Sequence, residues 1–128
     1  MSEPKWLLTD FVIAVHGMLL AEHGGPSGVR DKVMLESALA RPLNKYHYEP
    51  ATSICELASA YSYGIAMNHP FVDGNKRTAL MAGIVFLEIN DVHLISSEAE
   101  TAAVFEALAA GKLTEEELGR WFGERCST

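Results

Sequence analysis

Apolar residues recur with helical spacing along most of the chain, and this pattern predicts six helices. Thr9 and Asp10 can cap the first helix, which is expected to run up to a glycine-rich loop. Asp31 can cap a second helix, which is expected to end before Pro42 because the residue ahead of a proline disfavours helical geometry. Residues 44–50, rich in tyrosine, are expected to be irregular. The apolar face of the first helix comprises Phe11, Val12, Val15, Leu19 and Leu20.

Three further helices are marked by a serine or threonine followed three residues later by glutamate, the pattern of a capping box. The three pairs are Ser53 with Glu56, Ser97 with Glu100, and Thr114 with Glu117. The first pair predicts a helix from Ile54 to about Met67. The other two pairs predict the fifth and sixth helices.

A fourth helix is predicted from about Lys76 to Glu88, and it is apolar around almost its whole circumference. Such a helix belongs at the centre of a core. Asn90 and Asp91 are expected to end it, and residues 92–95 are expected to be extended. The fold class is therefore all-α, with residues 1–128 forming one compact domain of about six helices, accompanied at most by a small β-hairpin.

The amino-acid composition and net charge exclude several classes of protein. With 128 residues, 48% of them hydrophobic, the chain can bury a core without metals or disulfides. Cys55 and Cys126 lack metal-ligand spacing, so free thiols in a reducing compartment are expected. No apolar run approaches the ~20 residues of a membrane span, and no signal-peptide pattern is present, so a cytoplasmic protein is expected. The net charge of −7 argues against nucleic acid as a main partner.

Most of the candidate chemistry falls in residues 69–78, with the sequence HPFVDGNKRT. A proline and a glycine force a turn, and Gly74 lets the backbone approach a ligand closely. Asn75 is expected to cap the fourth helix, leaving the backbone amides of its first turn free to bind an anion. Lys76 and Arg77 are each unfavourable at a helix N-terminus by roughly 0.3–1 kcal/mol unless an anion is bound. The segment therefore predicts a phosphate site.

His69 and Asp73 add acid–base and metal-binding chemistry to this loop. A histidine titrates near neutrality and can accept a hydroxyl proton. A single carboxylate beside phosphate can hold Mg²⁺. Taken singly, His69 could be structural, Asp73 could form an Asx turn, and the basic pair could be solvated; Phe71 is expected to be a core anchor. A Walker P-loop and the spacing of zinc hydrolases are both absent.

Residues 69–77 resemble the signature of the Fic/Doc superfamily, H-x-F-x-[DE]-[GA]-N-[GK]-R. Fic proteins, which transfer AMP, have glycine where this chain has Lys76, and a second arginine where it has Leu80. Lysine followed by Arg-Thr-Ala-Leu looks like the death-on-curing (Doc) branch. The resemblance covers about residues 10–122. Upstream, the Doc-like positions are His16, Gly24-Gly25, Gly28, Arg30-Asp31, residues 35–38 and Arg41-Pro42.

The resemblance implies a small all-α Fic fold and the toxin of a bacterial type II toxin–antitoxin pair. Doc toxins are kinases that move the γ-phosphate of ATP onto a threonine of elongation factor Tu, which stops translation. By this resemblance His69 would be the base on the target hydroxyl. Asp73 would position that hydroxyl or help to hold Mg²⁺. The nucleotide phosphates would be bound by Gly74, Asn75, Lys76 and Arg77.

The resemblance also implies how activity is restrained. The inhibitory helix of Fic proteins, [ST]-x-x-x-E-[GN], has no match here, because Thr101 follows the correctly spaced Ser96 and Glu100. A separate Phd-like antitoxin is therefore expected to dock a helix into a groove. Three alternatives stay open: an adenylyltransferase, a catalytically silent nucleotide-binding domain, and an enzyme with another protein substrate. The segment Tyr46-His47-Tyr48 is expected to serve packing or a flap edge.

Overall fold

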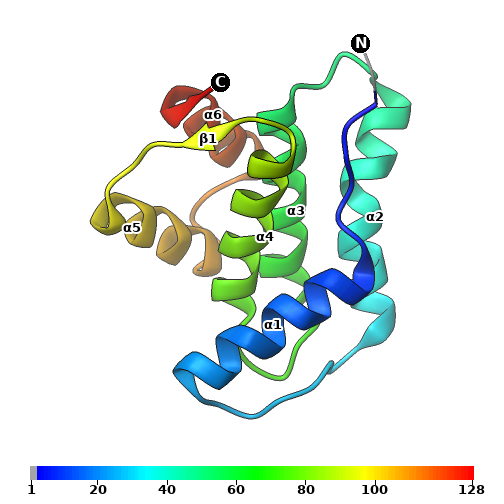
Figure 1. The fold of residues 1–128 in the computed structure, drawn as a ribbon, viewed down its shortest axis with the longest axis vertical. Coiled ribbons are helices and arrows are strands. Elements are labelled where there is room, and N and C mark those ends of the chain that lie inside the picture. Colours follow the sequence, from blue (N-terminus) through cyan, green and yellow to red (C-terminus); the bar gives the residue numbers. More distant parts are fainter. Residues whose placement is uncertain (1–2) are drawn as a thin grey trace.

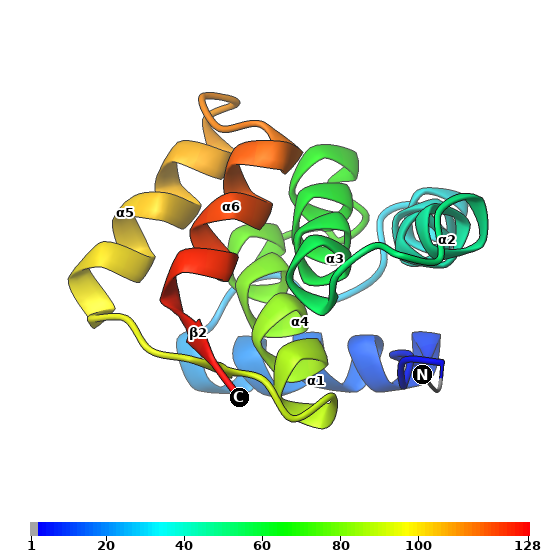
Figure 2. The same cartoon turned by 90° about the horizontal axis from the view of Figure 1, so that it is seen from above.

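The computed structural model describes residues 3–128, and its centre is a pair of helices, α3 and α4 (Figures 1 and 2). Helix α3 packs against α2, α4 and α6, while α1 and α5 pack against α4. The all-α fold class is confirmed. The helices are α1 (Thr9–His23), α2 (Lys32–Tyr48), α3 (Ile54–Asn68), α4 (Asn75–Ile89), α5 (Glu98–Ala109) and α6 (Glu115–Arg125).

The central position expected for the fourth helix is confirmed. Helix α4 contacts α1, α3, α5 and the short strand that follows it. It buries Ala79, Phe86 and Leu87 completely. Between residues 3 and 128, no helix combines the length and the apolar character needed to cross a membrane.

The short sheet joins two distant segments. Strand β1 (His93–Leu94) pairs antiparallel with β2 (Cys126–Ser127), so the expected extended segment exists but its partner is the end of the chain and not a hairpin neighbour. Both cysteines are free, as predicted. Burial and the adjoining Cys55 raise the pKa of Cys126 to about 12.

Four of the predicted helix caps are confirmed. Ser53 with Glu56 and Thr114 with Glu117 form complete capping boxes, and the Ser97 hydroxyl accepts from the backbone N–H of Glu100. Asp31 caps α2 by accepting from the N–H of Met34 at 3.1 Å. Each of these side chains satisfies an amide that the helix itself leaves unpaired.

The prediction that the second helix ends before Pro42 is wrong. Residues 44–48, expected to be irregular, are also helical, and only residues 49–50 of that segment lie outside the helix. Helix α2 continues to Tyr48 with Pro42 buried inside it. Proline removes one helical hydrogen bond, to the carbonyl of Ala38. That carbonyl faces α3, where a Cβ added to Gly64 would lie 3.2 Å from it. Close packing of α2 on α3 therefore outweighs the missing bond.

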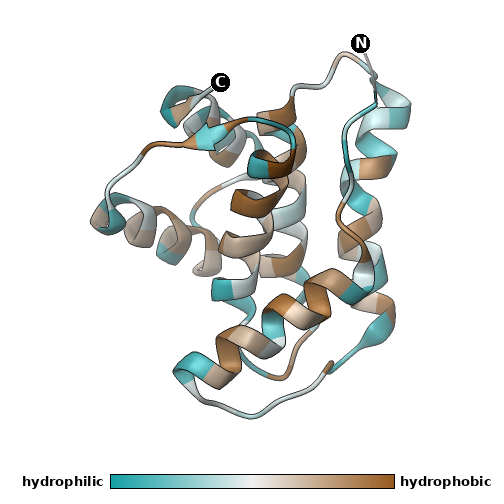
Figure 3. Ribbon diagram, viewed as in Figure 1, coloured by the Kyte–Doolittle hydropathy of each residue, from teal (hydrophilic) through white to brown (hydrophobic). Residues whose placement is uncertain are grey.

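Helix α1 also differs from expectation. Thr9 and Asp10 lie inside the helix, and Leu8 at the N-cap makes no side-chain capping bond. Apolar positions recur along the helix (Figure 3), yet its buried residues are Val12, His16 and Leu20, whereas Phe11 is 43% exposed. A histidine thus occupies the middle of the face that the apolar pattern assigned to the core.

Candidate functional site

The predicted loop lies between the end of α3 and the start of α4, beside the segment that joins α1 to α2 (Figure 1). His69 and Asp73 are both exposed to solvent. Phe71 is only 1% exposed and joins the hydrophobic core, which confirms it as the anchor of the loop.

His69 stands at the C-cap of α3 in a left-handed conformation, with φ 48° and ψ 55°. This region is uncommon for a residue other than glycine. Arg30 holds the turn: its Nε donates to the carbonyl of His69 at 2.7 Å, and its Nη2 donates to the carbonyl of Asn68 at 3.0 Å. The guanidinium therefore satisfies carbonyls at the helix end and fixes the backbone of the candidate base.

A second set of bonds runs along the loop. The N–H groups of Arg30 and Asp31 donate to the carbonyl of Pro70 at 2.7 and 3.1 Å. The N–H of Val72 donates to the carbonyl of Gly28 at 3.1 Å. Residues 28–31 therefore pair antiparallel with the loop, and they fix it along one side.

Asn75 does not cap the fourth helix, so that prediction is wrong. Gly74 is the N-cap, with φ 78°, and no side chain caps this helix start within residues 3–128. The Asn75 side chain turns back onto Phe71, accepting from its N–H and donating to its carbonyl, both at 3.0 Å. The side chain is thus used to close the loop, while the first-turn amides of α4 are left without a side-chain cap.

Asp73 lies against the glycine-rich loop that follows α1. Its Oδ1 accepts from the N–H of Gly74 at 2.8 Å, and a Cβ on Gly25 would lie 2.5 Å from its Oδ2. Across residues 3–128 no group of three or more His, Cys, Asp or Glu side chains could hold a metal ion. Mg²⁺ bound to phosphate needs only one or two carboxylates, so Asp73 fits as its single protein ligand.

The two cations expected to bind phosphate are both exposed on the first turn of α4. The Lys76 Nζ donates to Glu106 of α5 at 2.6 Å, and this bond and charge lower the pKa of Glu106. The ion pair is exposed on both sides and contributes little to stability. A bound phosphate can therefore compete with Glu106 for the ammonium group.

Arg30, Gly25 and His16 shape the loop, although sequence reasoning gave none of them a role. His16 Nε2 lies 2.8 Å from the carbonyl oxygen of Asp73. The glycine cluster and the following Arg-Asp pair were visible as a pattern upstream. Their sequence positions alone did not show that α1 and the next segment would meet the loop.

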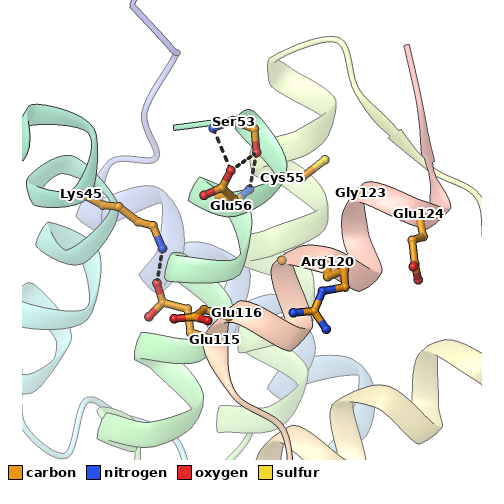
Figure 4. A pocket seen from close by; sticks show the side chains of 10 residues that line it. Lys45, Ser53, Cys55, Glu56, Glu115, Glu116, Arg120, Gly123 and Glu124 are labelled. Carbon is orange, nitrogen blue, oxygen red and sulfur yellow. Dashed lines mark hydrogen bonds and ion pairs between the residues drawn. The ribbon is translucent and has the colours of Figure 1, made fainter. Parts of the chain in front are cut away.

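A separate open cavity of about 580 Å³ lies at the other end of α3, between α3, α6 and the end of α2 (Figure 4). Lys45 and Glu115 form an ion pair there, with Nζ 2.8 Å from Oε2. The cavity contains none of the predicted site residues. The candidate site is therefore the loop, which joins the opposite end of α3 to α4.

Known proteins resemble this chain over a region that contains the loop. The model of the Fic/DOC family matches residues 6–87, and the chain belongs to this family, in its death-on-curing branch. "Protein kinase doc" of Escherichia phage P1 is 32% identical over 103 residues, which cover 80% of this chain and 81% of the phage protein. "Toxin Doc" of Mycolicibacterium smegmatis is 43% identical over 72 residues, which cover 56% of this chain and 55% of that protein.

Proposed function

We propose that this chain is a Doc-type toxin that transfers the γ-phosphate of ATP to a threonine hydroxyl of a protein. The observation that carries the proposal is the hydrogen-bonded loop: it holds an exposed histidine and an exposed carboxylate just ahead of an uncapped helix start. The phage relative that is named a protein kinase supports the choice of reaction.

His69 is the base in this proposal. The target hydroxyl oxygen forms a bond to the γ-phosphorus, the bond from that phosphorus to the bridging oxygen breaks, and ADP leaves. The hydroxyl proton passes to the His69 ring. Because transferred phosphoryl groups need positioning and charge stabilisation more than covalent help, a preorganised loop suits the reaction.

The start of α4 binds the phosphates in this proposal. The uncapped amides of Asn75 to Arg77 carry the partial positive charge of the helix end. Lys76 and Arg77 add full charges, with Lys76 exchanging Glu106 for phosphate. Mg²⁺, held by Asp73 and the phosphates, would neutralise charge on the γ-phosphate as the reaction proceeds.

Two residues of α4 favour phosphate transfer over AMP transfer. Lys76 replaces the glycine of the AMP-transferring Fic proteins and adds bulk and charge beside the phosphates. Leu80 replaces their second arginine, and it is half-buried against the core, where it offers no charge to a phosphate. We expect the nucleotide to present its γ-phosphate, and not its α-phosphate, to the target.

The proposal extends to partners. The protein target is elongation factor Tu, and a Phd-like antitoxin restrains the enzyme by docking a helical segment in trans. The relative named Toxin Doc supports this setting. Purification of the protein from its native operon is expected to bring a small antitoxin with it, and purification without one would contradict the pairing.

Induced expression of the wild type and of His69→Ala tests the function. We expect growth arrest and a phosphothreonine on elongation factor Tu, detected by mass spectrometry, from the wild type but not from the variant. His47→Ala is the matched control, since this exposed histidine lies near the far end of α2. Equal toxicity of wild type and His69→Ala would rule out the catalytic assignment.

A further inference from the structure

His16 connects α1 to the loop through one buried ring. The side chain is 3% exposed, and its ring stacks on Phe71 with centroids 3.8 Å apart and planes 9° from parallel. Its Nε2 lies 2.8 Å from the carbonyl oxygen of Asp73. A Cβ added to Gly74 would lie 3.6 Å from the same nitrogen. One ring therefore contacts Phe71 and the backbone of Asp73, and it lies close to Gly74.

The contact with Asp73 fixes which ring nitrogen carries the proton. A carbonyl oxygen can only accept, so Nε2 must be protonated and must donate. In the neutral ring Nδ1 is then the bare nitrogen. A carbonyl at the turn into α4 is thereby held by a donor from outside the loop and outside α4.

We infer that His16 is a positioning residue, whose Nε2–H holds the backbone at Asp73 and so sets both the Asp73 carboxylate and the first turn of α4. It touches no substrate and acts through the loop. The inference rests on the proposed transfer at this loop. If stacking on Phe71 were the whole role of His16, any aromatic ring could replace it. The hydrogen bond to Asp73 additionally requires a donor at the position of Nε2.

Four variants of the full-length protein separate these demands. In His16→Gln the amide nitrogen can reach the place of Nε2, whereas in His16→Asn the same amide group is one methylene too short. His16→Phe keeps the stacking without the donor, and His16→Ala removes both. Each variant is measured for kcat with ATP and the protein target, for nucleotide affinity, and for hydrogen exchange of the Phe71, Val72 and Gly74 amides.

We expect kcat to fall roughly 10- to 100-fold in the Asn, Phe and Ala variants, because misplacing a reacting group by about 1 Å has effects of this size. Nucleotide affinity should fall in the same three variants, because Asp73 and the first turn of α4 hold Mg²⁺ and the phosphates in the proposed function. His16→Gln should recover most of kcat. Exchange of the loop amides should be faster in the Asn, Phe and Ala variants and close to wild type in the Gln variant.

Equal loss in the Gln and Asn variants would overturn the inference, because it would mean that the histidine only fills space. Unchanged exchange of the loop amides in the Asn variant would also overturn it. Hydrogen exchange does not depend on the reaction. If the wild type transfers AMP or nothing at all, the proposed function fails, and the exchange pattern still decides the role of His16.

Discussion

Gly25 and Asp73 show how the site depends on the absence of a side chain. Gly25 has φ +115°, and a Cβ there would lie 2.5 Å from Asp73 Oδ2, a distance that forces the carboxylate to move. Gly24, one residue earlier, also has a positive φ, +80°, but a Cβ there would meet nothing within 4 Å. Gly24 and Gly25 both have positive φ, but only at Gly25 would an added side chain collide with Asp73.

Gly25→Ala should therefore lower kcat by tenfold or more, while Gly24→Ala should leave kcat within about twofold of wild type. Both substitutions should cost about 1–2 kcal/mol of stability, because alanine is strained at positive φ. Kinetics and urea unfolding of the two variants measure these quantities side by side. Similar activity losses in both would show that backbone strain, and not the position of Asp73, is responsible.

Among the helices, α3 and α6 begin at the capping boxes that the sequence predicted. The Ser53 hydroxyl accepts from the Glu56 N–H at 3.1 Å, and both groups belong to one short stretch of chain. Such bonds need no distant partner, which is why the capping pattern located these helices from sequence.

Ser53→Ala should lower the free energy of unfolding by about 1 kcal/mol, the usual contribution of a capping hydroxyl. Activity should not change, because Ser53 is at the end of α3 opposite the loop. Ser37→Ala, on the exposed face of α2, serves as the control and should be nearly neutral. Urea denaturation of both variants measures the difference, and equal destabilisation would contradict the capping role.

Elsewhere the helices depend on contacts that no local pattern contains. The second helix was expected to end before Pro42. Helix α2 instead continues to Tyr48, because its packing against α3 outweighs the hydrogen bond that proline removes. Asn75 was expected to cap α4, but it turns back to the backbone of Phe71. The candidate catalytic residues were found from sequence because they share one loop. His16 and Arg30 were not given roles, since their partners become visible only when α1 and the next segment fold against that loop.

At the scale of the whole molecule, Glu115 ties α6 to α2. Its carboxylate bonds Arg41 Nε at 2.7 Å and Lys45 Nζ at 2.8 Å. Burial is the largest single influence and would raise the pKa of Glu115, but the hydrogen bonds and charges of Lys45 and Arg41 outweigh it, and the pKa lies below its ordinary value of 4.5. The ionised form is therefore favoured by folding.

A depressed folded pKa gives a stabilisation that is complete above the unfolded value of 4.5 and is lost as the pH falls through the folded value. The wild type should therefore lose more stability than Glu115→Gln between about pH 6 and about pH 3. Urea unfolding at the two pH values gives the comparison. Glu116 is the exposed neighbour of Glu115, so the stability of Glu116→Gln should depend on pH as that of the wild type does. Identical pH dependence of all three proteins would contradict the stabilising role of the Glu115 ion pairs.

The proposed phosphate transfer is tested most directly by following the label from ATP. Purified wild type is incubated with elongation factor Tu and ATP labelled at either the α- or the γ-phosphorus, with His69→Ala in parallel. We predict that label from the γ-phosphorus alone appears on a threonine of the target, and that the variant transfers none. Label arriving from the α-phosphorus, or transfer that persists without His69, would contradict the proposed kinase.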